Sequence, residues 1–219
     1  LAEMARMNIP VPPGFTISTE VCIYYMQHGK YPPGCKKQIK DNLKKIENIM
    51  GQFYGSAKNP LLVSVRSGAK KSMPGMMETV LNVGLTSSTI VGLIDKTKNK
   101  RFSYDSYRRL IMMYSDVVMD KTSLSEINIR SILENILFKY KKRHSIKNDS
   151  SLNENDLVTI CDKFQKIINK KLKNTFPNNH MQQLEGSIEA VFKSWNGKRA
   201  IEYRKIEKIP NPWGTAVNV

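Results

Sequence analysis

The side chains best suited to chemistry lie in one loop, residues 66–79, between two strand-like apolar runs at 61–65 and 79–83. Arg66 directly follows the first run, so its guanidinium is expected to emerge at the end of a strand, beside the loop backbone. The loop also contains hydroxyl donors, basic side chains and glycines: Ser67, Gly68, Lys70, Lys71, Ser72 and Gly75. Open glycine backbone, hydroxyl groups and an arginine together bind phosphate oxygens. The sequence therefore predicts a phosphate-binding loop over 66–79.

The composition of the same loop supports two interpretations equally, a nucleotide-binding loop and an ordinary hairpin connection. Pro74 and Gly75 set a turn, and Met76 and Met77 after it offer soft apolar surface that fits a purine ring. Alternatively, the segment is a hairpin connection with its lysines in solvent and its two methionines in a core. The loop composition leaves both interpretations open.

A second candidate is a helix expected over 101–119. Arg101 and Arg108 are two turns apart and share a face, and Arg109 lies roughly 100° round from Arg108. Adjacent arginines beside an aromatic-rich face clamp di- or triphosphate well, because each guanidinium fork binds two oxygens at once. The alternative is ordinary ion pairing with the acidic residues of the same helix, Asp105 and Asp116.

The elements that position these residues are mainly helical. Within 36–53, Ile39, Leu43, Ile46 and Met50 recur at spacings of three and four, which is the apolar stripe of a surface helix. We expect helices over 19–27, 36–53, 101–119, 124–140, 152–172, 181–195 and 198–206. A terminal strand-like run, 215–219, needs a partner strand and a continuation, and neither follows it in the sequence. The pattern as a whole predicts the α+β class.

The net charge of +16, from 35 Lys and Arg against 19 Asp and Glu, is typical of proteins that bind polyanions. The basic residues are spread over helical segments, however, and aromatic residues do not alternate with them as base stacking requires. We therefore predict solvated surface charge and no nucleic-acid partner. A basic helical module that binds nucleic acid or another polyanion is the alternative function. No run of 18 apolar residues is present, so we expect no membrane partner.

Metal and thiol chemistry have little support. Cys22, Cys35 and Cys161 are far apart and form no CxxC pair, so we expect reduced thiols in an intracellular protein and no metal site. None of the three histidines has a neighbouring carboxylate or cysteine that would suggest a catalytic triad. No carboxylate pair is placed to hold Mg²⁺.

Four segments carry more specific motifs, and they span nearly the whole chain. They are LAEMARMNIPVPPGFTISTEVC at 1–22, LLVSVRSGAKKSMPGMMETVLNVGL at 61–85, RFSYDSYRRLIMMYSDVVM at 101–119 and AVFKSWNGKRAIEYRKIEKIPNPWGTAVNV at 190–219. In this order they resemble the N-terminal nucleotide-binding domain of the pyruvate, phosphate dikinase family. The related phosphoenolpyruvate synthases have a similar VRS strand end, but the SGAKKSMPGMMET and RFSYDSYRR motifs are those of the dikinases.

The resemblance implies an ATP-grasp-type fold, in which two α/β lobes hold ATP between them. This chain is expected to be a fragment of that fold with a large helical insertion. The expected domains are an ATP-binding lobe over 1–100 with phosphate loop 66–79, a mainly helical subdomain over 101–206, and a return to the lobe over 207–219. The family's ATP-binding lysine and metal ligands would lie outside the chain, so we expect the fragment itself to be inactive.

The resemblance also implies a reaction and a set of site residues. The family converts ATP, inorganic phosphate and pyruvate to AMP, pyrophosphate and phosphoenolpyruvate through a phosphohistidine on another domain. Arg66 and Arg109 match its catalytic arginines, which bind phosphate and serve phosphoryl transfer. The residues expected to bind ATP are Arg66, Ser67, Gly75, Met77, Thr79 and Arg108.

The implied partners are ATP with Mg²⁺, inorganic phosphate, and the phosphohistidine and pyruvate-binding domains of a complete enzyme. The complete enzyme is expected to be a homodimer in the cytoplasm or an organelle.

Overall fold

The computed structural model of the chain describes residues 2–68, 70–120 and 127–219. A four-stranded sheet, in the order β1–β6–β4–β5, consists of Thr16–Ile17, Val217–Asn218, Val63–Ser67 and Thr79–Val83. All neighbouring pairs are antiparallel. Strand β6 lies between β1 and β4, so the terminal run has two partner strands although none follows it in the sequence. Its partners come earlier in the chain, as far as 202 residues away, where no local pattern reveals them.

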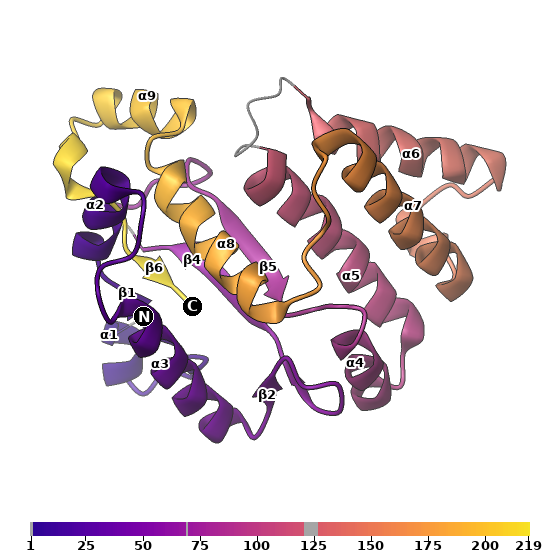
Figure 1. The fold of residues 1–219 in the computed structure, drawn as a ribbon, viewed down its shortest axis with the longest axis horizontal. Coiled ribbons are helices and arrows are strands. Elements are labelled where there is room, and N and C mark those ends of the chain that lie inside the picture. Colours follow the sequence, from indigo (N-terminus) through magenta and orange to yellow (C-terminus); the bar gives the residue numbers. More distant parts are fainter. Residues whose placement is uncertain (1, 69, 121–126) are drawn as a thin grey trace.

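Helices make up most of the remaining chain, and the predicted α+β class is confirmed (Figure 1). They are α1 Ala2–Arg6, α2 Thr19–His28, α3 Cys35–Met50, α4 Thr89–Thr97, α5 Lys100–Tyr114, α6 Ile129–Arg143, α7 Glu154–Leu172, α8 His180–Ser194 and α9 Lys198–Ile206. Short 3₁₀ turns occupy Asp149–Ser151 and Asn211–Trp213. A second, parallel pair of strands joins β2 Phe53–Tyr54 to β3 Pro60–Leu61.

Two helices hold the sheet in place. Helix α8 crosses over β4 and β5 in Figure 1, and its Leu184, Ile188 and Val191 are fully buried. Helix α5 lies along β5, which is one of the two edge strands of the sheet. There the Leu81 amide donates to Sδ of Met113 at 3.3 Å. A helix that covers an edge strand prevents it from pairing with another chain.

The predicted helices are present, with shifted ends that have local causes. Helix α3 ends at Met50 because Gly51 adopts a left-handed backbone conformation, with φ of 60°, and Phe53 then begins β2. The helix expected over 101–119 divides into α5 and a π-helical segment, Ser115–Asp120. Helix α4 is not expected from the hydropathy pattern.

Helices α5, α6 and α7 pack together on the right of Figure 1. The helix expected over 124–140 corresponds to α6, and positions 121–126 lie outside the described residues. Because α5 also packs on β5, the helical region is continuous with the sheet's core. The domain boundaries at 100 and 206 remain predictions.

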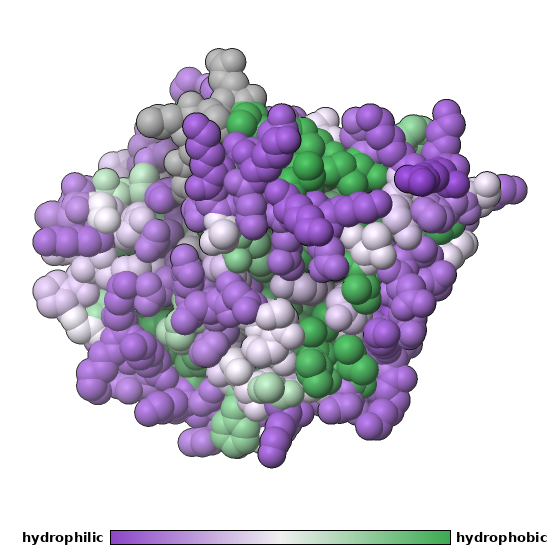
Figure 2. Space-filling view, turned by 45° about the vertical axis from the view of Figure 1, so that its right-hand side comes forward, coloured by the Kyte–Doolittle hydropathy of each residue, from purple (hydrophilic) through white to green (hydrophobic). Residues whose placement is uncertain are grey.

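Basic side chains cover much of the surface. Helix α3 buries Cys35, Ile39, Leu43 and Ile46 in one stripe, and its lysines are exposed between them. Figure 2 shows hydrophilic residues over most of one face of the molecule. Among the described residues, no helix combines the length and the apolar character that crossing a membrane requires.

Candidate functional site

One face of the sheet presents polar side chains from all four strands. The register pairs Thr16 with Asn218, Asn218 with Arg66, and Arg66 with Thr79. Directly paired residues on neighbouring strands point to the same face, so these four side chains form one row. Thr16 and Arg66 are exposed, and Asn218 and Thr79 are half-buried. We call these four residues the polar row.

Arg66 faces outward because side chains alternate along β4. Val63 and Val65 are buried, so Ser64 and Arg66 point to the opposite face. No residue of the described ranges forms an ion pair or a side-chain hydrogen bond with the Arg66 guanidinium. Because the Arg66 guanidinium is exposed and has no counter-charge among the described residues, it is available to bind an anion.

The two lysines of the loop bind to the C-terminal part of the chain. Lys71 Nζ lies 2.8 Å from Oε2 of Glu207, and Lys70 Nζ lies 4.8 Å from the ring centroid of Trp213. These contacts tie the loop to the segment that follows α9. The loop is thus attached at its middle rather than free in solvent.

The loop methionines pack against the C-terminal part of the chain in a buried apolar cluster. Met73 is buried in a small apolar cluster with Trp195, Ala200 and Ile209. Met76 and Met77 are partly buried against this cluster, as the hairpin interpretation expected in part. Gly75 forms the turn between them with a φ of 71°. The predicted contact of Gly75 and Met77 with a nucleotide stays a prediction.

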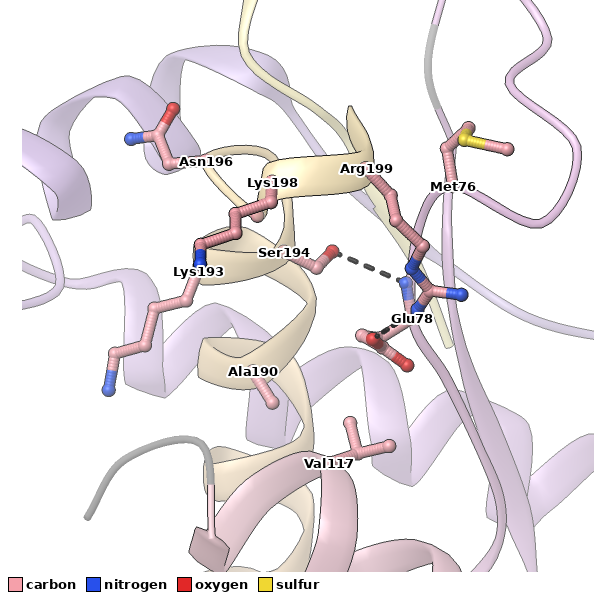
Figure 3. Close-up of a pocket in the computed structure, with 10 residues that line it drawn as sticks. Met76, Glu78, Val117, Ala190, Lys193, Ser194, Asn196, Lys198 and Arg199 are labelled. Carbon is pink, nitrogen blue, oxygen red and sulfur yellow. Dashed lines mark hydrogen bonds and ion pairs between the residues drawn. The ribbon is translucent and has the colours of Figure 1, made fainter. Parts of the chain in front are cut away.

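Beside the loop, a pocket of about 370 Å³ opens between the end of α8 and the start of α9 (Figure 3). Arg199 Nη2 lies 3.2 Å from Glu78 Oε1, and the Glu78 amide donates to Oγ of Ser194 at 3.3 Å. Two further cations line it, Lys193 and Lys198. The C-terminal end of the loop over 66–79 therefore forms one wall of a basic pocket.

The adjacent arginines of α5 have opposite environments. The Arg108 side chain is only 4% exposed, and its Nη2 lies 2.6 Å from Asp105 and 3.3 Å from Asp149. Its Nη1 donates to Sδ of Met112 at 3.5 Å. Arg108 is therefore occupied by internal partners, and the alternative of ordinary ion pairing describes it better than the expected phosphate clamp.

Arg109, by contrast, is 60% exposed. Its Nε donates to Oδ2 of Asp105 at 2.8 Å, and no described residue accepts from its two Nη atoms. Asp105 thus bridges the two arginines, with Oδ1 on Arg108 and Oδ2 on Arg109. Burial alone would raise the pKa of the Asp105 carboxyl, but the hydrogen bonds from both arginines outweigh burial and lower that pKa. The outer edge of the Arg109 fork stays open to solvent.

Arg101 has a structural role. Its Nε and Nη2 donate to the backbone carbonyls of Leu152, Asp149 and Ser150 at 2.7 to 3.1 Å. These bonds fix the connection between α6 and α7 against the start of α5. Of the four arginines that the sequence singles out, Arg66 and Arg109 are exposed, whereas Arg101 is half-buried and Arg108 is buried.

Within 2–68, 70–120 and 127–219, no group of three or more His, Cys, Asp or Glu side chains is placed to hold a metal ion. The carboxylate of Glu78 in the loop is paired with Arg199, and that of Glu207 is paired with Lys71. The described residues therefore do not form a Mg²⁺ site.

Sequence reasoning did not find two members of the polar row, Thr16 and Asn218. Each lies in a strand of only two residues, which is too short for an alternating pattern. The GTAVNV ending was a recognised motif, but nothing local showed that Asn218 would lie next to Arg66.

An α+β domain with an open, polar sheet face and two outward-facing arginines is a frame for binding phosphate groups. The profile of one family, described as "Pyruvate phosphate dikinase, AMP/ATP-binding domain", matches residues 34–219. The chain belongs to this nucleotide-binding family.

Similar proteins include the pyruvate, phosphate dikinases of Clostridium symbiosum and Giardia intestinalis, each 43% identical over the whole chain. A chloroplastic pyruvate, phosphate dikinase of Mesembryanthemum crystallinum is also 43% identical over the whole chain. The chain spans 24% of the length of the first two relatives and 22% of the third.

Proposed function

We propose that this chain is the part of a pyruvate, phosphate dikinase that binds the phosphates of ATP. The observation that carries the proposal is the guanidinium of Arg66, which has no partner among the described residues and is exposed on the polar sheet face at the start of the loop. The complete enzyme would convert ATP, inorganic phosphate and pyruvate to AMP, pyrophosphate and phosphoenolpyruvate. A phosphohistidine on another domain would carry the phosphoryl group.

In this proposal Arg66 and Arg109 stabilise the negative charge of the phosphates during phosphoryl transfer. Phosphoryl transfer spreads negative charge over oxygens that are not themselves reacting, so positioned cations stabilise its transition state. Asp105 holds Nε of Arg109 and leaves the two Nη atoms free for a bidentate contact with phosphate. Arg108 would contribute through Asp105, by supporting that carboxylate from the buried side, rather than by touching ATP.

The remaining expected ligands belong to the loop and its flanks. Thr79 is the cross-strand partner of Arg66, and Ser67 is its neighbour in β4. Gly75 and Met77 lie farther along the loop, where we propose that backbone and thioether face the nucleotide. The Mg²⁺ that accompanies ATP would be held outside this chain, which by itself is proposed to bind nucleotide weakly and to be inactive. Homodimer formation and a cytoplasmic or organellar location belong to the same proposal.

Replacing Arg109 with Ala tests the role of α5. In the complete enzyme, we expect the ATP- and phosphate-dependent half-reaction to slow about 100-fold, because one preorganised cation is lost. The half-reaction between phosphoenolpyruvate and the histidine should keep its rate. Rapid-quench measurements of phosphohistidine formation, once from ATP and once from phosphoenolpyruvate, give the rates of the two half-reactions separately.

Arg130→Ala is a matched control for Arg109→Ala. Arg130 is 61% exposed, it is likewise paired with an aspartate, Asp116, and it lies on a helix with no proposed role in ATP binding. Equal slowing by both substitutions would show that the effect is general surface charge, and the assignment of Arg109 would be wrong.

A further inference from the structure

The side-chain amide of Asn218 lies in the middle of the polar row, between the strand of Thr16 and the strand of Arg66. The Thr16 hydroxyl donates to Oδ1 of Asn218 at 2.7 Å. This bond fixes the amide, so Nδ2 is directed to the other side of the side chain. No residue within the described ranges accepts from Nδ2. Asn218 therefore holds an oriented hydrogen-bond donor on the face where Arg66 is exposed.

The glycine after the strand leaves room for that donor. Gly68 lies two residues beyond Arg66 and shares its face, and its amide donates to the carbonyl of Ala216 at 2.7 Å. A Cβ atom at position 68 would stand 2.8 Å from Nδ2 of Asn218 and 3.3 Å from its Cγ. Any side chain at 68 would thus push the amide out of place. The absence of a Cβ also opens the approach to Nδ2 from the loop.

We propose that Asn218 is a further phosphate-binding residue, whose Nδ2 donates to the same phosphate group that Arg66 binds; this rests on the proposed function of the Arg66 face. Directly opposed residues on antiparallel strands have Cβ atoms about 5 Å apart, which places one amide donor and one guanidinium fork within reach of a single tetrahedral anion. Thr16 is a positioning residue that sets the amide, and Gly68 keeps the space open.

The ligand is a phosphate group, which either the ATP chain or free inorganic phosphate can supply. Kinetics of the ATP half-reaction in the complete enzyme distinguish the two sources, because KM is measured separately for Mg·ATP and for phosphate. Asn218→Ala is expected to raise one of these KM values about tenfold, as loss of a hydrogen bond to a charged acceptor does. The KM that changes identifies the source.

Asn218→Asp is the isosteric variant, and it keeps the acceptor for Thr16. Its carboxylate would pair across the strands with Arg66 and repel phosphate, so we expect the same KM to rise at least 100-fold while the melting temperature is unchanged or higher. A purely structural role of Asn218 predicts the opposite combination, with a lower melting temperature and an unchanged KM.

Two further variants test whether Thr16 affects phosphate binding through Asn218. Thr16→Val keeps the branched shape without the hydroxyl and should raise the KM about threefold, an effect that disappears when Asn218 is already Ala. Asn178→Ala is the matched control, because Asn178 also bonds a hydroxyl, that of Ser87, in a segment away from the sheet. It should leave both KM values unchanged.

The outcomes separate this proposal from the proposed function. If Arg66→Ala impairs the ATP half-reaction but both Asn218 variants leave the two KM values within twofold of the parent, the Asn218 proposal is overturned and the function stands. If Arg66→Ala also has no effect, both fail together. A rise in KM for Asn218→Ala that Asn178→Ala reproduces would equally overturn the phosphate contact.

Discussion

Replacing Arg66 with Ala in the complete enzyme is expected to slow phosphoryl transfer from ATP about a thousandfold, the largest effect of any substitution in this chain. The guanidinium has no partner among the described residues, so its removal leaves no buried charge behind and should cost little stability. What is lost is a preorganised cation at the phosphates, of the kind that contributes three or more orders of magnitude in other phosphoryl transferases.

The measurement for Arg66 is the rate of each half-reaction by rapid quench. The exchange between phosphoenolpyruvate and the phosphohistidine should continue at the parental rate, because the proposed function assigns it to another site of the complete enzyme. Arg66→Lys should recover only part of the activity, since an ammonium ion keeps the charge without the fork. Equal loss of both half-reactions, or of neither, would mean that Arg66 is not part of the ATP site.

Arg108→Ala is expected to act on stability instead. The buried guanidinium bridges Asp105 and Asp149, and removing it leaves two carboxylates with their desolvation cost and fewer partners. Breaking a buried pair in this way costs about 3 kcal/mol of unfolding free energy. Urea unfolding of the 219-residue chain measures it. The control is the neighbouring Arg109→Ala, which removes an exposed side chain and should cost less than about 0.5 kcal/mol.

The pH dependence of the Arg108→Ala effect gives a second check. In the parent chain the lowered pKa of Asp105 contributes stability above the pKa of the unfolded carboxyl and loses it as pH falls. Without Arg108, Arg109 alone opposes burial, so the pKa of Asp105 would be lowered less. The destabilisation should therefore be largest near neutral pH and shrink as the pH falls below about 4, until the lowered pKa of Asp105 in the parent chain has been passed and the carboxyl is protonated in both chains. A loss of stability that does not depend on pH would contradict this account of Arg108.

The parts of the site that local sequence predicts are those built from neighbouring residues. The strand that contains Arg66 and the strand that begins at Thr79 follow from apolar runs that flank one loop, and both are present. Helix α5 follows from its apolar periodicity. In each case the burial pattern of a few consecutive residues decides the structure.

The parts of the site that local sequence does not predict depend on partners far away in the sequence. Periodicity places Arg108 and Arg109 on one helix. It cannot tell which of the two arginines will pair with Asp149, which lies 41 residues from Arg108 in the sequence. Asn218 enters the site because β6 pairs with β1 and β4, a choice made by the packing of the whole domain. The attachment of Lys71 to Glu207 likewise spans 136 residues.

Arginine-directed modification of the complete enzyme tests the central claim most directly, because it reports where ATP lies. Phenylglyoxal should modify Arg66 and Arg109 in the free enzyme, and saturating Mg·ATP should protect both, as quantified by peptide mass spectrometry. Arg143, which is exposed and has no partner among the described residues, serves as the internal control and should react equally with and without ATP. Modification of Arg66 that Mg·ATP leaves unchanged would contradict the assignment of this sheet face to the phosphates of ATP.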